Sequence, residues 1–151
     1  MSSCQIIIYL DKVVSFITIN LMNTLDPKAI LSNAQTLAVL GVNQDPESYA
    51  NKIVRKIRHL NKTAYPVNPK YDTLFGEQVY ESLEKCPSIP DVVVFVVNPM
   101  IGIQYLQDMA DLNIPYLWLQ PGTIDMNLLD EAKRLNLVPI EACVLVVGNY
   151  L

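Results

Sequence analysis

The rest of the chain is organised around the stretch Thr36-Leu-Ala-Val-Leu-Gly-Val-Asn-Gln-Asp-Pro-Glu-Ser-Tyr49. Its first five residues form a short apolar run that is typical of a parallel strand covered on both faces. Gly41 follows this run, and glycine adopts backbone angles that other residues resist, while leaving room for a ligand. The stretch therefore predicts a buried strand, a turn at Gly41 and then the start of a helix.

The helix start after this turn has the features of an anion site. Asp45 and Ser48 are both suited to cap the helix, and Pro46 suits a first helical position. Free N–H groups and the positive end of the helix dipole then point toward the same place. Many turns of this kind in α/β proteins hold no phosphate, so the hypothesis needs support from the rest of the chain.

Length and composition limit the function classes. The chain has 151 residues, of which 51% are hydrophobic and 17% charged, and its formal net charge is −4. This size suits one domain with a proper core. The balance argues against disorder and against a general nucleic-acid binder, which is usually basic.

The cysteines and the histidine narrow the chemistry further. Cys4, Cys86 and Cys143 are far apart and odd in number, and no C-x-x-C pair occurs. Neither a zinc site nor a disulfide framework is indicated, and we expect no metal and a reducing, cytoplasmic location. His59 is the only histidine, which argues against a histidine dyad or a multi-histidine metal site.

Residues 1–22 form an N-terminal extension, and residues 23–151 form the predicted domain. The apolar runs 5–10 and 13–19 are too short to span a bilayer, so we expect no membrane association. A signal peptide would need a basic start and a small-residue cleavage site, which the extension lacks. A true start at Met22 is the favoured interpretation, and an additional strand on the sheet edge is the other alternative.

Hydrophobic runs and caps predict alternating strands and helices. The expected strands are Thr36–Leu40, Thr63–Val67, Asp91–Val97, Tyr116–Leu119 and Leu137–Ile140, with Val144–Val147 as a final edge strand. A short strand or turn is expected near Val79–Tyr80. The expected helices are Pro27–Asn33 capped by Asp26, Pro46–Leu60, a helix from Asn98-Pro99 to Leu112, and a helix to Asn136 capped by Thr123 or Asp125. In the second helix, Tyr49, Ile53, Ile57 and Leu60 are expected to face the sheet.

This alternation predicts an α/β fold, a Rossmann-like doubly wound parallel sheet in a single domain. We expect the strand order 3-2-1-4-5, which places the first and fourth strands at the switch point where such folds bind ligands. Polar or proline-rich residues follow four of the strands and would rim a cleft there: Gly41–Asn43, Asn68–Lys70, Asn98–Pro99 and Gln120–Gly122.

The sequence lacks the usual motif of a dinucleotide-binding site. Only Gly41 of the three glycines in G-x-G-x-x-G is present, and no acid at the tip of the second strand could bind a ribose diol. Asn68 and Lys70 stand there instead. A lysine at this position favours a phosphate near the ribose, as in NADP or coenzyme A.

Five blocks in register resemble a known family. They are Leu-Gly-Val-Asn-Gln-Asp-Pro-Glu-Ser-Tyr (40–49), Tyr-Pro-Val-Asn-Pro-Lys (65–70), Gly-Glu-Gln-Val-Tyr-Glu-Ser-Leu (76–83), Trp-Leu-Gln-Pro-Gly (118–122) and Glu-Ala-Cys (141–143). From about residue 26 to the end, the chain resembles the small stand-alone CoA-binding proteins, which are similar to the CoA-binding domain of the succinyl-CoA synthetase α subunit.

The resemblance implies a Rossmann-type domain that holds coenzyme A. By this resemblance, the diphosphate loop would include Gly41, Val42, Asn43 and Ser48, and Tyr49 is also expected among the cofactor-binding residues. The adenosine part would lie near Asn68, Pro69 and Lys70, and the inner end of the cleft near Gln120 and Gly122. Asn98 and Pro99 would border the cleft where many relatives carry a basic residue. Cys143 matches a cysteine that is common in the family.

The expected function is therefore binding of coenzyme A or an acyl-CoA, a small-molecule nucleotide thiol, without chemistry of its own. An NAD(P)(H)-binding redox-sensing module and thiol-linked acyl or disulfide chemistry at Cys143 are the alternatives. A partner enzyme or a homodimer is compatible with each of these functions. Gly41→Val is expected to abolish binding and to leave the fold largely intact.

Overall fold

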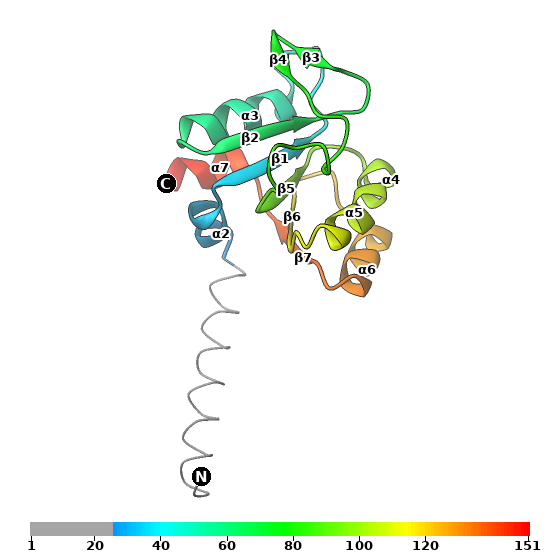
Figure 1. Ribbon diagram of the computed structural model, residues 1–151. Coiled ribbons are helices and arrows are strands. Elements are labelled where there is room, and N and C mark those ends of the chain that lie inside the picture. The colour runs from blue at the N-terminus through cyan, green and yellow to red at the C-terminus, as the bar shows by residue number, and fades with distance from the viewer. Residues whose placement is uncertain (1–25) are drawn as a thin grey trace, which may run out of the picture.

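The computed structural model describes residues 26–151, and the expectations for residues 1–22 lie outside this part of the chain. A five-stranded parallel sheet forms its centre, in the order β2-β1-β5-β6-β7 (Figure 1). The strands are β1 (Thr36–Leu40), β2 (Thr63–Val67), β5 (Val92–Phe95), β6 (Tyr116–Leu119) and β7 (Val138–Glu141). A separate hairpin pairs β3 (Thr73–Leu74) with β4 (Glu77–Gln78).

Helices cover both faces of the sheet (Figure 1). One face packs against α2 (Pro27–Asn33), α3 (Tyr49–His59) and α7 (Val144–Val147), and the last turn is η2 (Gly148–Tyr150). The other face packs against α4 (Pro99–Gly102), η1 (Ile103–Tyr105), α5 (Leu106–Asp111) and α6 (Met126–Arg134). These layers confirm the predicted α/β, doubly wound, Rossmann-like single domain. No helix of the described residues is long and apolar enough to cross a membrane.

The predicted strand order 3-2-1-4-5 is wrong in one respect. The strand that follows β2 in the sequence, β5, lies between β1 and β6 rather than outside β2. All four residues of β5 are buried, and a strand so apolar is best placed where both faces and both edges are covered. β2 carries Pro66, which has no N–H to donate and therefore suits a sheet edge. The switch point accordingly lies between β1 and β5.

A carboxylate fixes the start of these two central strands. Asp91 Oδ2 accepts hydrogen bonds from the backbone N–H groups of Gln35 at 2.9 Å and Thr36 at 3.1 Å. The Asp91 N–H donates in return to the Thr36 carbonyl at 2.9 Å. Because β1 and β5 begin in register, their carboxyl ends also finish side by side, at Leu40 and Phe95.

Two further predictions are corrected by the structure. α3 begins at Tyr49 after the Ser48 cap, so Tyr49 occupies the first helical position and is 68% exposed rather than turned toward the sheet. Residues 144–147 form helix α7 instead of an edge strand. A short apolar run does not by itself distinguish a strand from a helix, and in the fold this run packs against α2 and α3.

Gly102 provides a test of the packing between α4, β5 and α6. A Cβ built at Gly102 would lie 2.9 Å from Phe95 Cδ2 and 3.2 Å from Leu128 Cδ1. Gly102→Ala should therefore destabilise the fold by about 1–3 kcal/mol through overpacking, although alanine is the better helix former. Urea denaturation measures the change.

Met100→Ala is the matched control, because Met100 lies in the same short helix and is 79% exposed. It should change the free energy of unfolding by no more than about 0.5 kcal/mol. A Gly102→Ala protein as stable as the wild type, or more stable, would show that the Phe95 ring is not held as described.

Candidate functional site

A cleft opens at the carboxyl ends of β1 and β2 and is walled on the other side by α4, η1 and α5. Its volume is about 340 Å³. Four of the residues expected at the site line it together: Gly41, Asn68, Pro69 and Lys70. The opposite wall consists of Val97, Ile101, Gln104, Tyr105 and Asp108. Val67, Glu81 and Ser82 complete the lining. The cleft thus lies at the switch point between β1 and β5.

Gly41 is required by the backbone on which this cleft is built. Its φ is +101°, and a Cβ at this position would lie 2.3 Å from the Val96 carbonyl oxygen. Any side chain would push the loops after β1 and β5 apart. The expectation that Gly41→Val leaves the fold largely intact is therefore wrong, and this substitution is not a clean test of binding.

Two asparagine side chains hold the loop that follows Gly41. Asn43 Oδ1 accepts from the Asp45 N–H at 2.8 Å. Asn51, one turn into α3, donates from Nδ2 to the carbonyls of Asn43 at 2.7 Å and Asp45 at 2.6 Å. Asn51 is only 7% exposed. We did not predict its role, although its position three residues after the Ser48 cap is the spacing of a capping box, which was the available signal.

The same loop leaves backbone donors free. Among the described residues, none accepts a hydrogen bond from the N–H groups of Val42, Asn43 or Gln44. The loop leads into the N-terminus of α3, where Ser48 Oγ accepts from the Asn51 N–H and no acidic residue occupies the first turn. Such a terminus attracts anions through its dipole and its N–H groups.

Asn68 joins the loop after β2 to the loop after β1. Its Nδ2 donates to the Val42 carbonyl at 2.8 Å, and its Oδ1 accepts from the Lys70 N–H at 2.9 Å. The Lys70 side chain is exposed at the rim of the cleft. Asn68 thus links the loop that carries Lys70 to the loop that follows Gly41.

The charges of the cleft are mixed. Glu81 and Asp108 are exposed on its walls, against the single lysine, Lys70. Burial, with a smaller effect of the Asp108 charge, raises the pKa of Tyr105, so its hydroxyl stays protonated at neutral pH. An anion is therefore favoured near Lys70 and the loop at 42–44, and disfavoured at the Asp108 wall.

The remaining predicted residues lie along the same edge but do not line this cleft. Asn98 and Pro99 begin α4, where Asn98 Oδ1 accepts from the Ile101 N–H at 3.0 Å. Gly122 is exposed, with a φ of +87°. Gln120 is 5% exposed, and its side-chain nitrogen has no acceptor among the described residues. A buried amide donor without a partner is costly, so Gln120 is the least satisfied polar group of this edge.

The two described cysteines differ in position. Cys86 lies in the segment that follows Ser82, and its Sγ is 3.7 Å from the Ser82 carbonyl oxygen. Burial raises the pKa of the Cys86 thiol to about 11. Cys143 is the N-cap residue of α7 and is partly exposed beyond the end of β7.

A family model and a curated protein that match this chain are both described by coenzyme A. Residues 35–149 match the family described as CoA binding domain. The chain is 27% identical over 78 residues to an ADP-forming acetate–CoA ligase of Methanocaldococcus jannaschii; this match covers 52% of the chain but 11% of the ligase. The chain thus spans about a tenth of the length of that curated relative.

Two solved structures share the fold over most of their length. A hypothetical protein of Pyrococcus horikoshii superposes with a TM-score of 0.75 at 25% identity, covering 81% of this chain and 87% of that one. A Thermus thermophilus protein described as cell-free ID.343 superposes with a TM-score of 0.73 at 28% identity, covering 82% and 94%. Together with the match over residues 35–149, these findings show that the chain belongs to the CoA binding domain family.

Proposed function

We propose that this protein binds coenzyme A or an acyl-CoA at the carboxyl ends of β1 and β2. The diphosphate would lie on the loop after Gly41, and the adenosine part near Asn68, Pro69 and Lys70. The observation that carries the proposal is the set of free N–H groups at 42–44, in the loop that leads into the N-terminus of α3, near a cleft whose rim holds Lys70.

The energetics require these donors to act together. A charge near an exposed helix terminus gains only about 0.3–1 kcal/mol, and micromolar binding needs about −8 kcal/mol. Hydrogen bonds from N–H groups to phosphate oxygens are charge-assisted and stronger than neutral ones. Because Asn43, Asn51 and Asn68 already hold the loops, little ordering cost remains to be met on binding.

The other predicted residues take places further along the edge. Asn98 and Pro99 would border the ligand after β5, and Gln120 and Gly122 would lie at its inner end. The unpartnered Gln120 amide nitrogen is suited to donate to an amide carbonyl of the pantetheine arm. Ser48 and Tyr49 would contribute through the start of α3, Ser48 as its cap and Tyr49 as an exposed ring.

We propose recognition without a reaction as the role of this chain. The one histidine, His59, closes α3 at the end opposite the Ser48 cap and therefore lies far from the loop of free N–H groups. Any chemistry on the bound thioester would come from a partner enzyme. Cys143 has no role in this proposal.

Isothermal calorimetry with coenzyme A, acetyl-CoA and NAD tests the function itself. Coenzyme A and acetyl-CoA should bind with similar, micromolar affinity, because both carry the diphosphate and the 3′-phosphate. NAD lacks the 3′-phosphate and should bind at least about tenfold more weakly. Binding of NAD alone would contradict the proposal and favour the nicotinamide alternative.

The affinities of the wild type and Lys70→Gln for coenzyme A and dephospho-CoA, measured by calorimetry, test the position of the ribose 3′-phosphate. If Lys70 contacts the 3′-phosphate, the substitution should weaken coenzyme A binding about fivefold, equal to about 1 kcal/mol for an exposed charged contact. Dephospho-CoA lacks that phosphate, and its affinity should be the same for both proteins.

Lys133→Gln is the control, since Lys133 is an exposed lysine in the last turn of α6. It removes one positive charge, as Lys70→Gln does, and should leave both affinities unchanged. Equal losses for coenzyme A and dephospho-CoA in Lys70→Gln would place the phosphate elsewhere.

Cys86 should react slowly with thiol reagents at neutral pH. A thiolate is the reactive species, and burial raises the pKa of this thiol to about 11. Its reaction with a disulfide reagent at pH 7.5 should be about a hundredfold slower than that of a free cysteine whose pKa is about 8.5, and it should accelerate as the pH rises toward 11. Peptide mapping by mass spectrometry separates Cys86 from the other cysteines; rapid labelling at pH 7.5 would contradict the described burial.

A further inference from the structure

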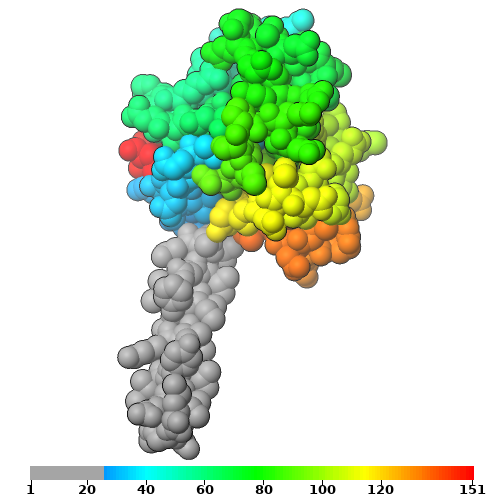
Figure 2. Space-filling model, in the orientation of Figure 1, coloured from blue at the N-terminus to red at the C-terminus, as the bar shows by residue number. Residues whose placement is uncertain are grey.

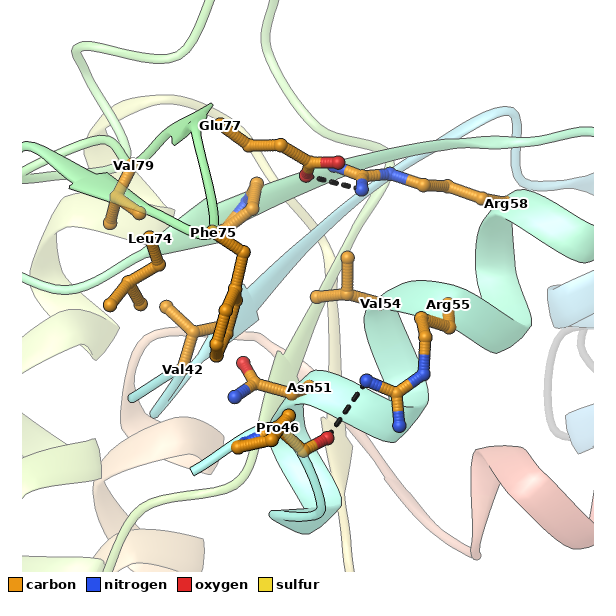
Figure 3. A pocket seen from close by; sticks show the side chains of 11 residues that line it. Val42, Pro46, Asn51, Val54, Arg55, Arg58, Leu74, Phe75, Glu77 and Val79 are labelled. Atoms are coloured by element: carbon orange, nitrogen blue, oxygen red, sulfur yellow. Dashed lines mark hydrogen bonds and ion pairs between the residues drawn. The ribbon is translucent and has the colours of Figure 1, made fainter. Parts of the chain in front are cut away.

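A second cleft lies on the other side of the loop that follows Gly41, between α3 and the β3–β4 hairpin (Figure 3). It shares no lining residue with the cleft beside Lys70. In Figure 2, the green segment that carries the hairpin forms the top of the molecule. The walls of this second cleft are mainly apolar: Val42, Pro46, Val54, Leu74, Phe75 and Val79.

Phe75 covers this cleft at a conformational cost. Phe75 and Gly76 have φ values of 52° and 77° and form the two-residue turn between β3 and β4. Turns with two positive φ values favour asparagine, aspartate or glycine, and a bulky residue there is an outlier. The Phe75 side chain nevertheless points down between Val42 and Val54 (Figure 3), and the residue is 62% exposed. An aromatic ring is thus held over the cleft without being buried.

The floor of the cleft carries one hydrogen-bond acceptor. Asn51 is 7% exposed, and its Nδ2 is occupied by the Asn43 and Asp45 carbonyls. Its Oδ1 points toward the Phe75 ring (Figure 3), and no described residue donates to it. An accessible carbonyl oxygen at the floor of a cavity is suited to a ligand that carries an O–H or N–H group.

The charges at the rim do not favour an anion. Arg58 pairs with Glu77, which links α3 to the hairpin. Arg55 Nη1 donates to the Pro46 carbonyl at 2.8 Å, and its other Nη lies 3.8 Å from Glu47. Both guanidinium groups are therefore engaged with oxygen atoms of the protein itself.

The cleft is too small to enclose a whole nucleotide. Its volume is about 170 Å³, and an apolar cavity of about 150 Å³ is known to hold one benzene ring. We propose that this cleft binds one neutral aromatic ring with a single hydrogen-bond donor, which packs against Phe75 and donates to Asn51 Oδ1. Its lining differs from that of the cleft beside Lys70, although Val42 also belongs to the loop proposed for the diphosphate.

Phenol and toluene form a matched ligand pair for this proposal, because they have the same shape and only phenol carries a donor. Titrations followed by methyl NMR should show phenol shifting Val42, Val54, Leu74 and Val79. Phenol should bind about fivefold more tightly than toluene, the gain of one hydrogen bond. Equal affinities, no binding of phenol, or shifts confined to the Val67 and Val97 methyls of the other cleft would overturn the proposal.

Two variants test the Phe75 ring. Phe75→Asn removes the ring and introduces a residue that favours the positive φ of this turn. The hairpin should therefore persist, while phenol binding should weaken about tenfold. Phe75→Tyr keeps the ring and should bind phenol within about twofold of the wild type. Unchanged binding in Phe75→Asn would show that the ring does not contact the ligand.

A final titration with phenol at saturating coenzyme A tests whether the two sites are separate. Unchanged phenol affinity supports separate sites. Displacement of phenol would show that the cleft belongs to the nucleotide site, and would overturn the inference. The phenol and toluene titrations use no nucleotide, so they remain decisive even if coenzyme A does not bind.

Discussion

The contact between Gly41 and the carbonyl of Val96 is the constraint on which the site depends. With no Cβ at Gly41, the loops that leave β1 and β5 pass within van der Waals distance, and any side chain would meet the Val96 oxygen. The carboxylate of Asp91 fixes the opposite ends of the same two strands. The positions at which β1 and β5 begin and end are thus both determined, and the loop between Gly41 and Ser48 is directed to the N-terminus of α3.

Asparagine side chains hold the loop after Gly41 in one conformation through hydrogen bonds to its backbone. Asn43 and Asn51 use their amides on backbone groups of the loop, and Asn68 ties the loop to the end of β2. The segment borders two clefts: Gly41 lines the cleft beside Lys70, and Val42 and Pro46 line the cleft under Phe75. One short segment therefore borders both candidate binding sites.

Much of this arrangement could be predicted from the sequence because its signals are local. The β1 and β2 ranges, the Asp26 cap and the Asn98-Pro99 helix start follow from apolar runs and from capping residues next to them. The strand order could not be read from such runs, since it depends on packing between distant segments. Pro66 was a usable signal, because a strand with a missing N–H belongs at an edge.

The site was predictable in part for the same reason. Gly41, Asn68, Pro69 and Lys70 follow strand ends, and parallel strands bring such residues to one edge. Asn51 was missed because a polar residue inside an amphipathic helix looks like surface until its partners are known. The Phe75 turn was missed because the sequence places phenylalanine where turn residues are expected, and only the structure shows the cleft beneath it.

Backbone amide NMR during a coenzyme A titration shows whether the loop after Gly41 holds the diphosphate. If it does, the largest downfield proton shifts should occur at the N–H groups of Val42, Asn43 and Gln44, because these donors would gain phosphate acceptors. Saturable binding that leaves these three signals unchanged would contradict this placement of the diphosphate, even if the affinity were high.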